Sequence, residues 1–131
     1  MEMSMDQIRQ IIHETTTATV MKLKAAGLLQ TDEKTAFEKT ECLLRQYPEL
    51  KKVNEPYARR VAAEIDACLE AAKNDPYVGV IDLYYFQGLK NSVCADKIGC
   101  DERTSRRNRR QLVQQFSVRL ASEEFIRELL M

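Results

Sequence analysis

The stretch DERTSRRNRRQL, residues 101–112, holds five arginines in a chain of 131 residues whose formal net charge is zero. It follows NSVCADKIGC, residues 91–100, and these two stretches together decide the fold. They predict a short helix over about 92–98, a turn, and a long helix that begins at Glu102. Asp101 carries a side chain suited to capping the long helix. A helix, a tight turn and a basic second helix form the helix-turn-helix pattern.

Small residues around the turn make this pattern more specific. Ala95 lies four residues before Gly99, and a small side chain there lets the second helix cross closely. Gly99 can adopt the positive φ that such a turn uses. We expect Ser105 and Leu112 to face back toward the first helix. The expected structural residues of the motif are Ala95, Gly99, Asp101, Ser105 and Leu112.

The arginines of the long helix separate by face. At about 100° per residue, Leu112 and Phe116 share the inward side with Ser105, and Arg109 lies near that seam. The outward side carries Arg103, Arg106, Arg107, Arg110 and Gln114. From residue 103 to 120 there are six arginines and no acid, whereas a solvated helix face usually mixes charge signs. Arginine also suits two-pronged contact with phosphate or guanine.

We therefore expect double-stranded DNA as the partner, with a plain solvated helix face as the competing interpretation. Arg103 and Arg107 lie nearest the helix start and the centre of the face, so we assign them to base edges. The residues that we assign to phosphates are Arg106 and Arg110, helped by Lys90 and Asn91. Arg109 is expected to pack its stem on the seam and to reach the surface or an acid with its head.

The rest of the chain also reads as helix, which predicts an all-α fold with N-terminal helices packed on a C-terminal helix-turn-helix unit. Pro56 and Pro76 each follow a capping residue, and Ser122 is placed to cap a final amphipathic helix. The boundary at about Asp75 divides residues 1–74, a candidate oligomerisation region, from residues 75–131. The additional expected helices cover about 5–26, 33–48, 56–74, 76–88 and 123–131.

Composition narrows the function classes. The first ten residues include acids and no apolar core, and no run approaches about 18 apolar residues, so we expect neither signal peptide nor membrane span, and a cytoplasmic location. The four cysteines lack paired spacing and are expected to be small buried hydrophobes. We expect no metal and no cofactor. His13 is the only histidine, and no phosphate loop or nucleophile motif is present, so we expect no enzyme.

The quoted residues also resemble known proteins. LYYFQGLKNSVCADKIGCDERTSRRNRRQL, residues 83–112, resembles the helix-turn-helix of sigma-factor region four. Residues 47–130 are similar to the phage-encoded transcriptional regulators of the ArpU type, related to RinA-type late-gene activators. The similarity rests on YPELKK, DPYVGVIDLYYFQG, the Ala95–Gly99 spacing, ERTSRRNRRQLV and EEFIRELL. It implies a small cytoplasmic DNA-binding protein that controls phage or prophage genes.

Two alternatives stay open beside a sequence-specific regulator. One is a DNA-binding packaging component similar to a small terminase subunit, which would form large rings. The other is a protein-interaction module whose basic helix meets an acidic partner such as RNA polymerase. We also expect a homodimer, because the N-terminal helix and the apolar tail residues Phe125, Ile126, Leu129 and Leu130 all need burial.

Overall fold

Every element of the described chain is helical, which confirms the predicted all-α class. The structure is a computed structural model that describes residues 4–7 and 35–130. Met5–Gln7 are helical, and the remainder of the helix expected over 5–26 lies outside the described residues. The elements are α2 (Ala36–Leu50), α3 (Pro56–Ala71), α4 (Gly79–Ile81), the π-helix η1 (Asp82–Phe86), α5 (Asn91–Ile98), α6 (Glu102–Leu120) and α7 (Glu123–Leu130).

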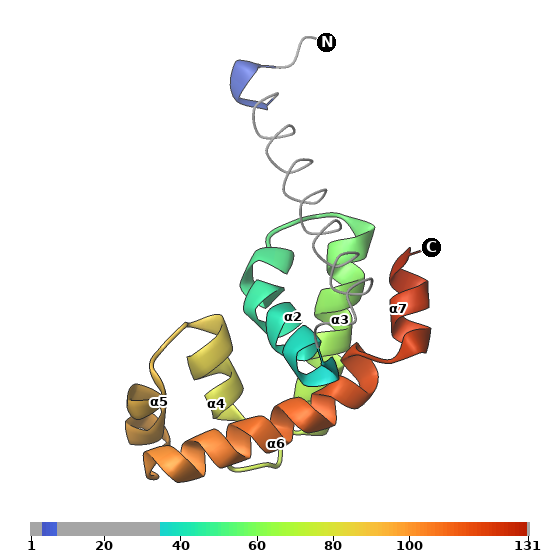
Figure 1. Cartoon of the computed structure of the whole chain (residues 1–131). Coiled ribbons are helices and arrows are strands. Elements are labelled where there is room, and N and C mark those ends of the chain that lie inside the picture. The colour runs from blue at the N-terminus through green and yellow to red at the C-terminus, as the bar shows by residue number, and fades with distance from the viewer. Residues whose placement is uncertain (1–3, 8–34, 131) are drawn as a thin grey trace.

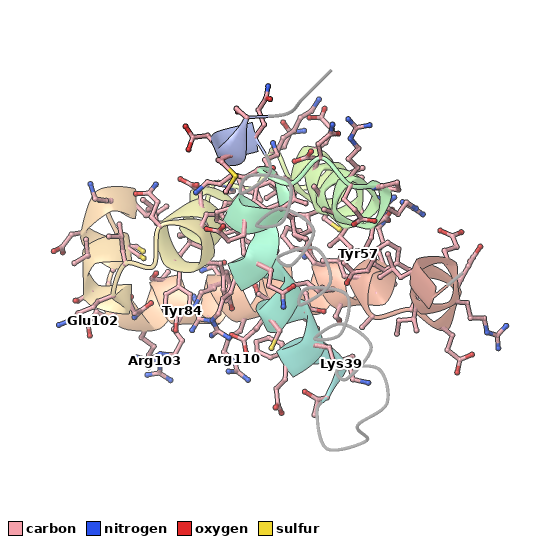
Figure 2. The ribbon with its side chains drawn as sticks, turned by 90° about the horizontal axis from the view of Figure 1, so that it is seen from above. Lys39, Tyr57, Tyr84, Glu102, Arg103 and Arg110 are labelled. Carbon is pink, nitrogen blue, oxygen red and sulfur yellow. The ribbon has the colours of Figure 1, made fainter. Side chains whose placement is uncertain are left out.

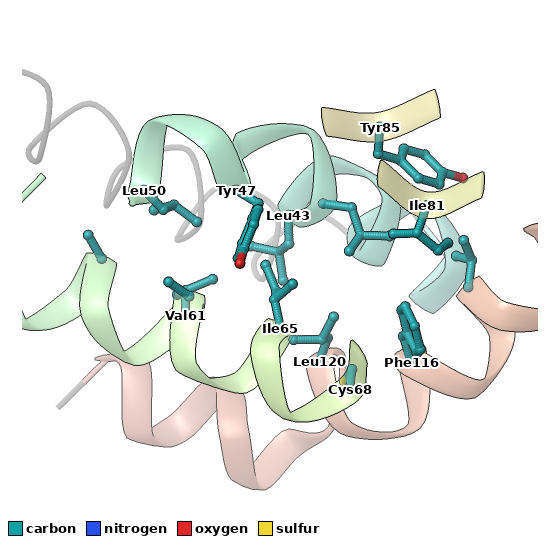
Figure 3. Packing of buried hydrophobic residues seen from close by; sticks show 14 of the residues in the cluster. Leu43, Tyr47, Leu50, Val61, Ile65, Cys68, Ile81, Tyr85, Phe116 and Leu120 are labelled. Carbon is teal, nitrogen blue, oxygen red and sulfur yellow. The ribbon is translucent and has the colours of Figure 1, made fainter. Parts of the chain in front are cut away.

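Helix α6 is the longest element and forms the spine of the described molecule (Figure 1). The elements α4 and α5 lie beside its N-terminal half, and α2 and α3 pack on it from the same side of Figure 1. A single cluster of buried apolar side chains joins these elements. Figure 3 shows Leu43 of α2, Ile65 of α3 and Leu120 of α6 close together in it. The described parts of regions 1–74 and 75–131 therefore share one core.

Local signals place the ends of α2 and α3, with one correction. Glu55 caps α3 by accepting hydrogen bonds from the amides of Tyr57 and the next residue, and Pro56 opens the helix as expected. Helix α2 begins later than we predicted, because Thr35 is its cap. Pro48 lies inside α2, and the helix ends two residues later, at Leu50, which agrees with the turn expected at or soon after this proline.

The fourth predicted helix is the least regular element. We expected one α-helix over about 76–88, and the structure has a turn, the three residues of α4, and then η1. The amide of Gln87 donates to the carbonyl of Asp82 at 2.9 Å, which is the i→i+5 bond of a π-turn. The segment stops at Gly88, as predicted, with φ of 69°.

The turn between α5 and α6 agrees closely with the prediction from the sequence. Gly99 is left-handed, with φ 87° and ψ 35°, and its amide donates to the carbonyl of Ala95 at 2.8 Å. Asp101 caps α6 by accepting from the amide of Thr104 at 2.7 Å. The expected motif residues Ala95, Ser105 and Leu112 are each only 1% exposed.

Helix α7 buries two of its apolar side chains within the chain. Phe125 and Leu129 belong to the core cluster, and Ser122 caps the helix as predicted. Arg60 of α3 lies over the Phe125 ring and pairs with Glu128. The expectation that this tail needs a second copy for burial is therefore wrong for these two apolar residues.

The cysteines fit the hydrophobic interpretation only in part. Cys68 and Cys94 are buried, whereas Cys42 and Cys100 are half-buried. Among the described residues there is no group of three side chains of the types that bind metals close enough to hold an ion. No helix of residues 4–7 and 35–130 is long and apolar enough to cross a membrane.

Replacing Gly99 by valine should lower the free energy of unfolding by about 1 kcal/mol or more, because a β-branched residue is strained at positive φ. Gly79→Ala is the matched control, since its new Cβ would meet Ile98 at 3.5 Å, an ordinary contact. Urea denaturation of both variants measures the difference. Equal stability of Gly99→Val and the parent chain would contradict the turn.

Candidate nucleic-acid interface

One face of α6 gathers exposed arginines, as the helical projection predicted. Figure 2 shows Arg103 and Arg110 on the same side of the helix. An open hollow of about 460 Å³ runs along this face. Its lining consists of Arg103, Arg106, Arg107, Arg110, Gln111 and Gln114. All six residues are exposed, so their polar heads are accessible to a ligand. We call Arg103, Arg106, Arg107 and Arg110 the arginine face.

The arginine face has no acidic partners within the described part of the chain. Its four guanidinium groups make no ion pair there, although Asp101 and Glu102 lie at the same helix end. Most other described arginines do have an acidic partner: Arg45, Arg60, Arg109, Arg119 and Arg127 each pair with a glutamate, whereas Arg59 bonds to Asn54. Four of the five described arginines without an acidic partner therefore lie on one helix face.

Arg109, between these exposed residues in sequence, points into the core. Its side chain is 7% exposed, and its guanidinium donates to the Tyr85 hydroxyl at 2.8 Å and lies 3.5 Å from a carboxylate oxygen of Glu41. The Tyr85 hydroxyl in turn donates to the same carboxylate at 2.7 Å. The Arg109 head therefore reaches an acid, one of the two outcomes that we expected. We call Arg109, Tyr85 and Glu41 the buried triad.

The electrostatics of the buried triad keep the tyrosine proton in place. Burial raises the pKa of Tyr85, and its hydrogen bond to Glu41 raises it further, against the opposing effect of Arg109. The hydroxyl therefore stays protonated and can both donate and accept. The ring of Tyr84 covers the other side of the guanidinium, at 4.0 Å from its carbon. Arg109 is thus enclosed between η1 and α2 and is not part of the exposed arginine face.

The N-terminus of α6 is fixed by two side chains. Hydrogen bonds from Thr104 lower the pKa of Asp101, and the nearby Arg107 and Arg103 add to this effect. Asn91, which we expected at phosphates, donates its side-chain amide to the carbonyl of Glu102 at 3.0 Å. Asn91 therefore ties α5 to the start of α6 and has less capacity for a ligand than we expected.

Lys90 lies just before α5 and is exposed, as a contact with phosphate would require. Sequence reasoning missed Glu41 and Tyr85, which determine the direction of Arg109. Glu41 lies 68 positions from Arg109 in the chain, so no local pattern links them. The only available signal was the place of Arg109 beside the apolar seam, which implied a partner without identifying it.

Comparison of this chain with models of protein families, with curated proteins and with solved structures finds no match.

Removing one member of the buried triad should destabilise the fold. We expect Arg109→Ala and Glu41→Gln each to lower the free energy of unfolding by about 3 kcal/mol, since each breaks the ion pair between the buried Arg109 and Glu41. Arg45→Ala is the control, because Arg45 also pairs with Glu41 but is exposed and should cost less than about 1 kcal/mol. Guanidinium denaturation compares the three. Equal effects of Arg45→Ala and Arg109→Ala would contradict the burial argument.

The lowered pKa of Asp101 predicts an acid-sensitive cap. A depressed pKa in the folded state stabilises the protein above the unfolded pKa, and that contribution disappears as pH falls through the folded value. The stability advantage of the parent chain over Asp101→Asn should therefore shrink as pH drops below about 4. Asp96→Asn, an exposed substitution on α5, is the control. A difference that does not vary with pH would count against a charged cap.

Proposed function

We propose that this protein is a sequence-specific DNA-binding transcriptional regulator and that α5 and α6 are its helix-turn-helix. Helix α6 acts as the recognition helix and presents the arginine face to the major groove. The observation that carries the proposal is the set of four exposed arginines on one helix face with no acidic partner among the described residues. A polyanion supplies the missing negative charge.

The length of the arginine face is compatible with the width of the DNA major groove. Arg103 and Arg110 are seven residues apart, which is about 10 Å along a helix axis. The major groove is about 12 Å wide and accepts an α-helix. The whole arginine face therefore fits in one groove crossing, with Gln114 one turn further along.

Repulsion within the arginine face argues against a purely solvated surface. Arg103 and Arg107 are four residues apart, as are Arg106 and Arg110, so each pair brings two like charges together on the helix. Each such pair destabilises a helix by about 0.2–0.5 kcal/mol. Phosphate groups bound at this face would relieve the repulsion, whereas water and salt only screen it.

The resemblance of residues 47–130 to ArpU-type regulators supports phage or prophage genes as the targets. In this proposal the protein acts as a regulator and has no enzymatic activity. Selection of bound sequences from a random DNA pool tests the proposal. An enriched motif supports it, and its symmetry reports how many copies bind. Binding without enrichment, together with ring-sized assemblies in sedimentation, would instead favour a packaging component.

Substitutions on the arginine face should separate base contacts from phosphate contacts. Arg103→Ala or Arg107→Ala should cost about 1–3 kcal/mol on the selected site and relax the preference at one base. Arg110→Ala should weaken all sequences alike and reduce the slope of log affinity against log salt by about one. Fluorescence anisotropy over a salt series measures both effects.

Arg127→Ala is the control for these substitutions, since Arg127 is an exposed arginine of α7 that pairs with Glu123. It should leave affinity and salt slope unchanged. If Arg127→Ala weakens DNA binding as much as Arg103→Ala, charge alone accounts for binding, and α6 has no special role.

A further inference from the structure

Helix α2 contacts two adjacent arginines of α6, one buried and one exposed. Glu41 pairs with the buried Arg109. One turn earlier on α2, the ring of Phe37 lies 4.7 Å from the guanidinium carbon of Arg110. Phe37 and Glu41 are four residues apart and therefore share one face of α2. This face meets the recognition helix from outside the helix-turn-helix pair.

We propose that Phe37 is a positioning residue of the DNA interface, which fixes the guanidinium of Arg110 in the direction from which it meets a phosphate. The inference rests on the proposed function, because it takes DNA as the ligand. It adds a contribution from α2, an element outside the pair α5 and α6 that the motif comprises.

The chemistry of the contact leaves Arg110 able to bind. An aromatic ring interacts with the flat face of a guanidinium group, whereas phosphate oxygens accept from the N–H groups in its plane. Stacking on Phe37 therefore does not use the donors that DNA requires. It restricts the rotamers of a long side chain before DNA arrives, which reduces the entropy lost on binding.

The position of Phe37 is itself fixed by neighbouring contacts. Its side chain is half-buried and packs against the core cluster. The pair between Glu41 and Arg109 holds the next turn of α2 against α6. Among the described residues, Arg103, Arg106 and Arg107 have no aromatic ring over them. Arg110 is therefore the member of the arginine face whose direction is preset.

The location of α2 agrees with this role. Lys39, two residues after Phe37, lies toward the same side of the molecule as Arg103 and Arg110 in Figure 2. The contact of Phe37 with Arg110 places the start of α2 at the edge of the arginine face. A DNA backbone that follows this face would pass the start of α2.

A double-mutant cycle on the full chain tests the inference with a mixed-sequence DNA duplex, since a phosphate contact needs no particular operator. Phe37→Leu removes the ring and keeps an apolar side chain, and Phe37→Tyr keeps the ring. We expect Phe37→Leu to weaken binding about two- to twelvefold, the range that corresponds to ordering one long side chain on binding. Phe37→Tyr should bind like the parent chain. In the Arg110→Ala background, Phe37→Leu should cause no further loss.

The cycle separates positioning from packing. Circular dichroism establishes that each variant is folded at the assay temperature, and Phe37→Met replaces Phe37→Leu if the latter does not fold. Equal losses from Phe37→Leu with and without Arg110 would overturn the inference, because the effect would then not pass through Arg110. Tighter binding by Phe37→Leu would also overturn it, since Phe37 would be withholding Arg110 from DNA.

Failure of the proposed function gives a different result. In that case Arg106→Ala and Arg110→Ala, which remove the proposed phosphate contacts, would both bind the duplex like the parent chain. If these two variants lose affinity and Phe37→Leu does not, only the role of Phe37 is rejected.

Discussion

The burial of the Arg109 guanidinium constrains the positions of three elements at once. A charged group that leaves water must regain its hydrogen bonds and a counter-charge, or the fold loses several kcal/mol. Tyr85 from η1 accepts a hydrogen bond from Nη1 at 2.8 Å, and Glu41 from α2 supplies the counter-charge at 3.5 Å, whereas the buried Nε has no hydrogen-bond partner among the described residues. Helices α2 and α6 and the π-helix therefore cannot shift independently. Because α6 is fixed in rotation about its own axis by this contact, the residues on either side of Arg109 are fixed as well, and Arg110 points outward.

The contacts of Arg109 also explain why residues 82–86 form a π-helix. Tyr84 and Tyr85 are neighbours in sequence, and both address Arg109, one with its ring face at 4.0 Å and the other with its hydroxyl. In an α-helix, adjacent side chains diverge by about 100°. A wider turn reduces this divergence and lets both approach one group, and π-turns often occur at functional sites. We infer that tertiary contact with α6, rather than the local sequence, selects the π-turn at residues 82–86.

Features set by contacts close in sequence could be predicted, whereas features set by contacts between distant residues could not. The starts of α6, α3 and α7 could be predicted from the sequence, because each capping side chain accepts a hydrogen bond from a backbone amide within three residues. The capping residues are Asp101, Glu55 and Ser122. The turn at Gly99 could also be predicted, because few other residues tolerate its positive φ. The buried triad joins residues up to 68 positions apart, and no pattern in the sequence specifies that pairing. The sequence likewise indicated which arginines face outward, but not that Phe37 covers Arg110.

The chain has zero net charge because its 20 basic and 20 acidic residues balance, yet these charges are unevenly distributed over the structure. Two arginines of α6 are neutralised by glutamates. The inward-facing Arg109 pairs with Glu41 of α2. Arg119, near the C-terminal end of α6, lies 2.8 Å from Glu64 of α3. The arginine face receives no such partner within the described residues, although it begins at the positive end of the helix dipole, where cations are unfavourable. Asp101 and Glu102 offset part of this cost at the first turn. The remaining cost is the kind that an external polyanion removes, so the distribution of charge in α6 supports the proposed contact with DNA.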